Sequence, residues 1–236
     1  MDVIEPIAAY TAATASFDDW LARTGDWVEL PNERRGGYSG VQRIQEGSTY
    51  LYRKHQINHC YRSWQHPLGE PTILREQRAL QAFTALGVKV PHVLYCAARK
   101  RAGTWEALLV TEALQGFESL ERIRELGLDK TWSPELRHNL FYELGASLAR
   151  LHTDRWQHGC LYPKHIFLRV SPCGQHGELA LLDLEKSRQR WSAHRAAQHD
   201  LTQLRRRSVH TPEDWEAVEQ GYQSVMGPIP PQTTKY

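Results

Sequence analysis

The pattern of apolar and polar positions divides the chain into a strand-rich first half and a mostly helical second half. Short runs of β-branched and aromatic residues between turn residues predict strands in the first half. These runs are Trp27–Leu30, Val41–Gln45, Thr49–Gln56, His92–Ala97 and Trp105–Glu112. Because successive side chains of a strand point to opposite faces, we expect Tyr50, Tyr52 and Lys54 on one face of the third run.

One helical pattern lies among these strands, over Thr72–Ala85, and Gly87 with Pro91 beyond it marks its end. The apolar residues of this segment recur at helical spacing, and Glu76 falls on the same stripe. An unpaired carboxylate in an apolar environment is costly, so we expect Glu76 to have a cationic partner.

The second half begins with a long predicted helix, from Pro134 to Arg150, because Pro is favoured in a first turn and leucines recur at helical spacing. A loop, a strand over residues 178–186 and a helical remainder that includes residues 199–207 follow. The tail from Met226 contains several prolines and is expected to be loose.

We therefore expect an α+β fold made of two lobes that together form one domain. Residues 1–113 would form an antiparallel sheet with one helix, and residues 114–236 a shortened, mostly helical lobe. The connection would lie near Thr111–Gly116. A cleft between two lobes is a common place for a ligand site.

Composition narrows the function classes. The chain has 236 residues, 29 Lys and Arg against 27 Asp and Glu, a formal charge of +2 and 41% hydrophobic residues, as in ordinary soluble globular proteins. Near-neutral charge disfavours a dedicated nucleic-acid binder. The longest apolar run, Val93–Ala98, is too short to span a bilayer, and the first residues do not resemble a secretory signal. We expect a cytoplasmic protein whose four cysteines are free thiols.

A glycine-rich stretch between the first two strands is the first candidate site. Gly36, Gly37 and Gly40 would let backbone N–H groups approach phosphate oxygens, and Arg34-Arg35 would add positive charge. A hairpin turn explains the same glycines without any ligand, and taken alone that explanation is favoured.

Two further candidates are a lysine on a strand and an aspartate at a strand end. Lys54 precedes the helix that carries Glu76, so the two could form an ion pair that holds the ammonium toward phosphate oxygens. A surface lysine on an edge strand is about equally plausible. Asp183 follows the apolar run Leu179–Leu182, where a carboxylate can hold Mg²⁺ or simply cap a helix.

The loop at residues 158–165 carries three potential metal ligands or reactive groups, His158, Cys160 and His165. With Cys173 and His176 they could suggest zinc, but the spacing matches no paired zinc pattern. Cys160 could be redox-active, although a buried inert cysteine is more common.

The order of these features is more specific than any one of them. A glycine-rich turn, a strand lysine, a helix glutamate, a hinge, a long helix, a His-containing loop and a strand-end aspartate follow one another as in the protein-kinase fold. The chain resembles the bacterial lipopolysaccharide kinase family, in its InaA/WaaP-like (Kdo/heptose kinase) branch, from about Trp27 to Arg207. The segments that carry the resemblance are RRGGYSGV, YLYRKHQ, HPLGEPTILREQRAL, HGCLYPKHIFL, LLDLEKSR and HDLTQLRRR.

The resemblance implies a role for each candidate residue. Gly36, Gly37 and Gly40 would cover the ATP phosphates, and Lys54 paired with Glu76 would contact the α- and β-phosphates. The hinge from Glu112 to Leu114 would face adenine. Asp183 would be a Mg²⁺ ligand, and His165 would stand at the position of the second metal ligand.

One residue departs from the kinase pattern. Cys160 occupies the position of the loop aspartate that accepts the proton of the substrate hydroxyl, and loss of such a base typically costs roughly 10²–10⁴ in rate. His165, Glu185 or Asp183 could take its place, or a thiolate could accept the proton. Phosphoryl transfer depends mainly on positioning and electrostatics, so Cys160 alone does not exclude activity.

The resemblance implies an ATP- and Mg²⁺-dependent kinase that phosphorylates a sugar hydroxyl of the lipopolysaccharide core. The chain would work in the cytoplasm, with peripheral contact to the inner membrane through basic patches. The first alternative is a pseudokinase, an ATP-binding or stress-response module without phosphotransfer. The second is a kinase of another small-molecule or protein acceptor.

Overall fold

The structure is a computed structural model that describes residues 15–34, 37–64, 66–209 and 211–227. The chain consists of two compact units, each defined by contacts among its own residues. Unit 1 comprises Met1–Arg78 and Pro91–Gln115, and unit 2 comprises Ala79–Val90 and Gly116–Tyr236. The division follows the contacts rather than a single point in the sequence, because residues 79–90 belong with the second unit.

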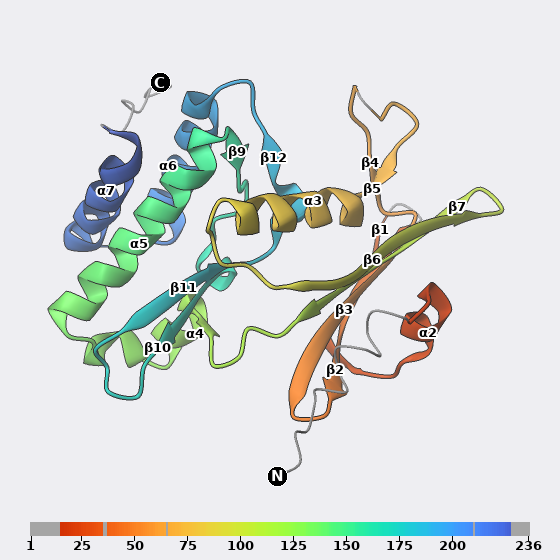
Figure 1. The fold of residues 1–236 in the computed structure, drawn as a ribbon, viewed down its shortest axis with the longest axis horizontal. Helices are drawn as coiled ribbons and strands as arrows, with labels where there is room; N and C mark the ends of the chain where they lie inside the picture. The colour runs from red at the N-terminus through yellow and green to blue at the C-terminus, as the bar shows by residue number, and fades with distance from the viewer. Residues whose placement is uncertain (1–14, 35–36, 65, 210, 228–236) are drawn as a thin grey trace, which may run out of the picture. The chain divides into compact units, whose positions relative to one another are not determined.

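Unit 1 is built on a five-stranded antiparallel sheet with the strand order β1-β2-β3-β7-β6 (Figure 1). The strands are β1 (Asp26–Arg34), β2 (Gly37–Glu46), β3 (Thr49–Ile57), β6 (Val93–Arg101) and β7 (Thr104–Glu112). All five predicted strands are present, each somewhat longer than its apolar run. The register places Lys54 of β3 between Val41 of β2 and Leu109 of β7.

A short helix and a small hairpin complete unit 1. Helix α2 (Phe17–Ala22) begins with a capping box in which Ser16 and Asp19 bond each other's backbone N–H groups. Its Trp20 is fully buried with four residues of the sheet. The hairpin consists of β4 (Cys60–Tyr61) and β5 (Glu70–Pro71). None of these three elements was predicted from the sequence.

Helix α3 (Thr72–Ala85) begins in unit 1 and ends in unit 2. Its bounds are those predicted from the apolar spacing and from Gly87, whose φ of 72° is the left-handed conformation that ends helices. Ile73 and Phe83 are fully buried, whereas Glu76 on the same stripe keeps 8% of its surface exposed. The helix therefore carries its carboxylate on its buried side, as expected.

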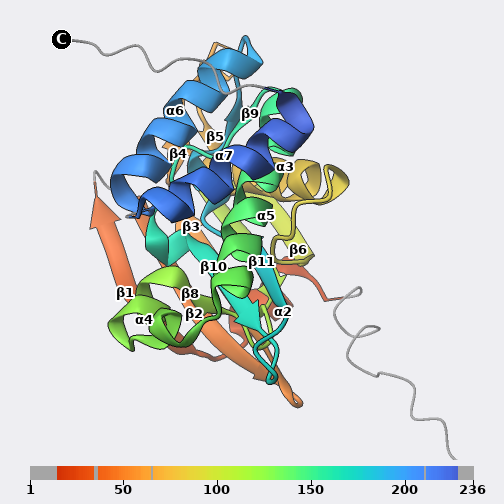
Figure 2. The same ribbon diagram turned by 90° about the vertical axis from the view of Figure 1, so that its left-hand side faces the viewer.

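Unit 2 is mostly helical (Figure 2). Its helices are α4 (Leu120–Glu125), α5 (Pro134–Thr153), α6 (Ala193–Arg207) and α7 (Pro212–Met226), with short 3-10 turns at Leu128–Thr131, Pro163–His165 and Leu184–Lys186. Two small antiparallel sheets accompany them, with the strands β8 (Glu118–Ser119), β9 (Trp156–Gln157), β10 (Ile166–Val170), β11 (Gly177–Leu181) and β12 (Arg188–Gln189). Their orders are β11-β10-β8 and β12-β9.

Helices α5 and α7 pack with their backbones unusually close together (Figures 1 and 2). A side-chain carbon at Gly145 would collide with the backbone of Val218, and one at Gly221 would collide with the backbone of Tyr142. The two glycines therefore permit the approach, and Tyr222 becomes fully buried beside them.

The predicted α+β fold is confirmed, and one strand is corrected. The strand expected over residues 178–186 ends at Leu181. Asp183 has a φ of 60° and a ψ of 63°, which breaks the extended conformation before a 3-10 turn. Among the helices in the described ranges, none combines the length and the apolar character needed to cross a bilayer. The tail predicted to be loose lies almost entirely outside these ranges.

Candidate active site

The ion pair expected in the first half of the chain is present in unit 1. Lys54 Nζ lies 2.7 Å from Glu76 Oε2, and the two side chains are only 15% and 11% exposed. The sheet positions the lysine through regular pairing on both sides of β3, and the buried face of α3 positions the glutamate. An ion pair this enclosed has a fixed geometry, so the ammonium group is held at a defined place in unit 1.

The glycine-rich stretch is only partly described. Gly36 lies outside the described residues, and Gly37 opens β2 opposite Arg34. Gly40 lies within β2, where a side-chain carbon would come 2.6 Å from the ring of Trp27. Packing against Trp27 within β2 therefore accounts for Gly40, whereas residues 35–36, where the hairpin turn was expected, lie outside the described residues.

The segment predicted as a hinge begins at Glu112, the last residue of β7. The backbone N–H of Glu112 donates to the carbonyl oxygen of His92, and that of Ala113 donates to the carbonyl oxygen of Tyr50, both at 2.9 Å. The sheet thus uses both of these donors, and Leu114, which is half-buried, provides the next backbone donor along the chain.

In unit 2, the loop and the strand end bring Cys160, His165 and Asp183 together. One potential ligand atom from each residue lies within 4.8 Å of the others. His165 Nδ1 is 2.7 Å from the carbonyl oxygen of Cys160, and a carbonyl only accepts, so this nitrogen carries the proton. The other nitrogen, Nε2, faces Asp183 Oδ2 at 3.3 Å.

Asp183 is held at the strand end by the backbone. The N–H of Leu182 donates to the carbonyl oxygen of His165 at 2.9 Å, and the left-handed conformation of Asp183 turns the chain immediately afterwards. Although Asp183 precedes a 3-10 turn, its side chain makes no capping hydrogen bond there. The helix-cap explanation considered from the sequence does not account for this carboxylate.

Cys160 is buried and its thiol is neutral. Burial, followed by the negative charge of Asp183, raises the pKa of Cys160 to about 11, and Lys186 only partly opposes this effect. A neutral thiol neither accepts a proton readily nor binds zinc as a thiolate does. Among the described residues, Cys173 and His176 do not join the cluster, so the zinc pattern considered from the sequence is incomplete.

The donor set of this cluster fits a divalent cation held mainly by oxygen. The carboxylate of Asp183 is the ligand type that Mg²⁺ prefers, usually together with water. His165 offers a lone pair on Nε2 because its proton is fixed on Nδ1. The two ligands named from the resemblance are thus side by side, whereas Cys160 adds no suitable donor while it is protonated.

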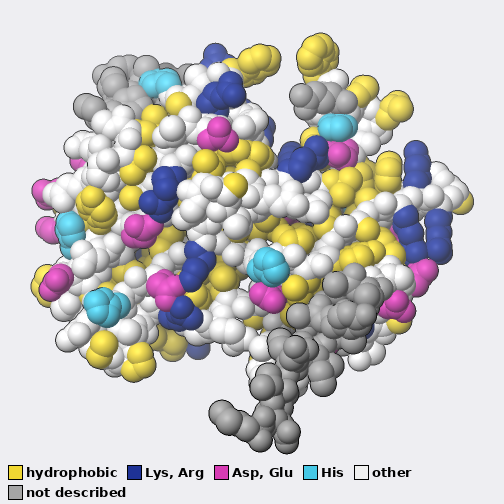
Figure 3. Space-filling model, viewed as in Figure 1, with side chains coloured by type: hydrophobic (Ala, Val, Ile, Leu, Met, Phe, Trp, Pro, Cys, Tyr) yellow, Lys and Arg dark blue, Asp and Glu magenta, His cyan; other side chains and the backbone are white. Residues whose placement is uncertain are grey.

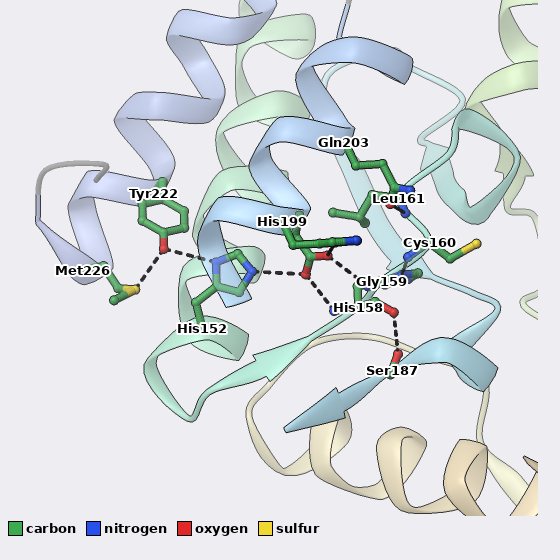
Figure 4. Close-up of polar contacts among 11 residues, drawn as sticks. His152, His158, Gly159, Cys160, Leu161, Ser187, His199, Gln203, Tyr222 and Met226 are labelled. Carbon is green, nitrogen blue, oxygen red and sulfur yellow. Dashed lines mark hydrogen bonds and ion pairs between the residues drawn. The ribbon is translucent and has the colours of Figure 1, made fainter. Parts of the chain in front are cut away.

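Asp200 is the important residue that the sequence did not identify, and Figure 4 labels its partners His152, His158 and Gly159. It is fully buried on α6 and accepts hydrogen bonds from the backbone N–H groups of His158 at 2.6 Å and of Gly159 at 2.9 Å. His152 Nε2 lies 3.2 Å from the same carboxylate. Burial opposes its ionisation, but the hydrogen bonds of His152 and His199 hold the pKa of Asp200 well below its usual range.

Further contacts fix the loop that leads to Cys160. Gln203 accepts a hydrogen bond from the backbone N–H of Leu161 at 2.6 Å, and Ser208 donates to the Leu161 carbonyl at 2.9 Å. Ser187 donates to the carbonyl oxygen of His158 at 2.9 Å. The sequence did carry a signal for Asp200, because it shares a helical stripe with Leu201 and Leu204 just as Glu76 shares one with apolar residues.

These features define a protein of the protein-kinase-like class: an antiparallel sheet with a buried Lys–Glu pair, and a helical unit with a His-containing loop and a strand-end aspartate. The family model for the "Lipopolysaccharide kinase (Kdo/WaaP) family" matches residues 18–222. The chain therefore belongs to the lipopolysaccharide kinase family, as the resemblance in its sequence implied.

Two relatives illustrate this membership. Protein InaA of Escherichia coli (strain K12) is 36% identical over 218 residues, which cover 92% of this chain and all of InaA. The solved structure "WaaP in complex with acyl carrier protein" is similar to this chain with a TM-score of 0.70 and 19% identity. The similarity covers 94% of this chain and 88% of the other, and it supports the fold.

Proposed function

We propose that this kinase-family protein transfers the terminal phosphoryl group of ATP, with Mg²⁺, to a sugar hydroxyl of the lipopolysaccharide core. The observation that carries the proposal is the enclosed Lys54–Glu76 ion pair in a chain of this family. A lysine held by a helix glutamate is the arrangement that kinases use to bind the phosphates of ATP. Cytoplasmic location, with peripheral contact to the inner membrane, is part of the proposal.

Each unit has a distinct task in the proposed reaction. In unit 1, Glu76 would keep Lys54 directed at the α- and β-phosphates, and the hinge around Leu114 would bind adenine. In unit 2, Asp183 and His165 would hold the metal ion. Bound Mg²⁺ would supply positive charge that stabilises the phosphates during transfer.

The proposed reaction needs a group that accepts the proton of the acceptor hydroxyl. Cys160 is neutral at physiological pH because burial and Asp183 raise its pKa to about 11. His165, Glu185 or Asp183 would then accept the proton. The raised pKa of Cys160 also favours the second candidate function, a pseudokinase that binds ATP without transferring phosphate.

Nucleotide binding is tested by the thermal stability of the full chain with Mg-ATP. At ATP about 100-fold above its Kd, binding stabilises a folded protein by about 2.7 kcal/mol, or about 5–10 °C in Tm at this size. We expect this shift for the wild type and for Lys100→Met, an exposed control in the same unit, and a much smaller shift for Lys54→Met. Equal shifts in both variants would contradict the role of Lys54.

Phosphotransfer is tested with γ-labelled ATP and lipopolysaccharide core oligosaccharide as acceptor. A kinase labels the oligosaccharide, and Asp183→Asn lowers the rate by at least about 10²-fold, since it removes a charged metal ligand. Cys160→Asp is expected to raise the rate, since it restores the usual base. An unlabelled oligosaccharide together with an intact ATP-dependent Tm shift supports the pseudokinase instead.

A further inference from the structure

Four arginines surround the small β9–β12 sheet of unit 2. Arg155 directly precedes β9, Arg188 opens β12, Arg190 follows it, and Arg195 lies in the first turn of α6. The backbone N–H of Arg190 donates to the carbonyl oxygen of Arg155 at 2.8 Å, which ties the two ends of this sheet together. We call these four residues the arginine cluster.

The arginine cluster lacks the acidic partners that other arginines of unit 2 have. Arg137, Arg150 and Arg169 pair with Asp214, Glu143 and Glu178, respectively. Figure 3 shows that acidic side chains also lie beside many of the basic ones on one face of the molecule. No member of the cluster forms an ion pair with a carboxylate of the described chain.

Arg190 has a side-chain donor without a hydrogen-bond acceptor among the described residues. Its Nε is buried and has no hydrogen-bond partner within the described chain. Burial, together with the positive charges of Arg188 and Arg195, lowers the pKa of Arg190. Asp200 acts in the opposite direction, but its carboxylate is fully buried and already bound to the loop N–H groups of His158 and Gly159. An external anion would relieve the repulsion among these three guanidinium groups.

A large exposed aromatic side chain adjoins the cluster. Trp191, between Arg190 and the start of α6, is 88% exposed. An exposed tryptophan has a cost in water, and its ring offers a flat apolar face with an N–H donor at its edge. Sugar rings have apolar C–H faces that can lie against such a ring.

The arginine cluster is connected directly to the loop that carries Cys160. Strand β9 ends at Gln157, immediately before that loop, and β12 pairs with it. Ser187, which precedes β12, donates to the carbonyl oxygen of His158. A ligand bound by the cluster would therefore lie on the segment that follows Asp183 and is fastened to the candidate catalytic loop.

We infer that the arginine cluster and Trp191 form a binding site for an anionic sugar, a saccharide that carries phosphate or carboxylate groups. Guanidinium groups match both anions through paired N–H donors, and the tryptophan face would take the sugar ring. The inference rests on the proposed function in one respect, because it assumes that the anionic sugar bound at this site is the acceptor of the phosphoryl group.

The test measures binding of fluorescently labelled lipopolysaccharide core oligosaccharide to the full chain by anisotropy, without ATP. Hydrogen bonds to charged groups predict that Arg188→Ser and Arg195→Ser each weaken binding by about 10-fold or more. Arg190→Lys keeps the charge but loses the paired donors, so we expect a smaller loss, and Trp191→Ala should weaken binding several-fold. The two matched controls, Arg206→Ser at the exposed end of α6 and Trp64→Ala at a 95% exposed tryptophan of unit 1, should bind like the wild type.

Chemically altered probes separate the two sources of negative charge. Loss of binding after dephosphorylation of the oligosaccharide assigns phosphate, and loss after reduction of its carboxyl groups assigns carboxylate. Unchanged binding after both treatments would overturn the inference, as would variants indistinguishable from the wild type or controls that lose as much. Tighter binding of a single-stranded oligonucleotide of equal charge would also overturn it.

The outcome is independent of the ATP-binding half of the protein. Binding is measured without nucleotide, so its failure leaves the Mg-ATP thermal shift intact, and failure of that shift leaves this measurement valid. In an active preparation, the cluster variants should raise KM for the oligosaccharide while kcat stays nearly unchanged.

Discussion

Two buried carboxylates, Glu76 in unit 1 and Asp200 in unit 2, occupy the same kind of position and do different work. Each lies on the apolar stripe of a helix, where an unpaired charge is costly. Glu76 pairs with the charged end of Lys54, a group that a ligand can approach. Asp200 binds backbone N–H groups of a loop and a fully buried histidine. The first carboxylate holds a charged side chain, and the second fixes the shape of a loop.

Removal of the Asp200 carboxylate should have the largest effect of the changes that test this difference between the two carboxylates. Asp200→Ala leaves the N–H groups of His158 and Gly159 and the ring of His152 without an acceptor, at about 1–3 kcal/mol for each buried group. We expect the free energy of unfolding to fall by about 3–5 kcal/mol, measured by urea denaturation. Asp200→Asn keeps one acceptor oxygen and should lose less, and a loss below about 1 kcal/mol for Asp200→Ala would contradict this role.

Acid should weaken unit 2 through the same network, in two stages. Burial lowers the pKa of His158 to about 4, so the stability that depends on neutral His158 is complete above pH 6.5 and is lost as the pH falls toward 4. The difference between the unfolded and folded pKa values corresponds to about 3 kcal/mol. The pKa of Asp200 is lowered below 3.8, so its contribution is lost only below about pH 4.

The measurement is Tm against pH from 8 to 3 for the wild type, His158→Gln and Asp200→Asn. We expect His158→Gln to flatten the curve between pH 6.5 and 4, and Asp200→Asn to flatten it below pH 4. Parallel curves for all three proteins would show that neither side chain controls the acid response.

Loss of the Glu76 charge should affect ligand binding more than stability. In Glu76→Gln the partner Lys54 keeps some exposure, so the free energy of unfolding should fall by only about 1–2 kcal/mol. The Mg-ATP shift in Tm should shrink severalfold, because the ammonium loses its fixed direction. A large loss of stability with a full nucleotide shift would make Glu76 a structural residue like Asp200.

The same comparison explains what the sequence could predict. The Lys54–Glu76 pair was predictable because both partners are side chains, one on an alternating strand and one on a helical stripe. Asp200 was not identified although it lies on a helical stripe, because its partners are backbone N–H groups and residues about 40 to 50 positions away, and the stripe does not reveal them. The end of β11 was also missed, because the left-handed turn at Asp183 is set by the loop contacts around it and not by a glycine.

The arginine cluster was missed for a related reason. Single arginines in a sequence are read as solvated surface charges, and only the structure shows which of them have acidic partners. The cluster also depends on the pairing of β9 with β12, two strands of two residues each that are about 30 residues apart. Strands this short leave no alternating pattern in a sequence.

The reactivity of the cysteines tests the difference between the two units through the smallest expected effect, because each unit carries a thiol near a carboxylate. Burial and the charge of Glu76 raise the pKa of Cys96 to about 12, and burial with Asp183 raises that of Cys160 to about 11. Cys173 is exposed, and the hydroxyl of Ser171 lowers its pKa. Iodoacetamide should therefore modify Cys173 first and both Cys96 and Cys160 much more slowly, as followed by mass spectrometry.

Asp200→Ala should change this order in one unit alone. Loosening of the loop exposes Cys160, so its alkylation should become several-fold faster, while the rates of Cys96 and Cys173 stay the same. Glu76→Gln is the matched variant of unit 1, and it should leave the rate of Cys160 unchanged. Equal acceleration of Cys96 and Cys160 in Asp200→Ala would mean that the carboxylate supports the whole protein rather than the loop, and the distinction between the two carboxylates would fail.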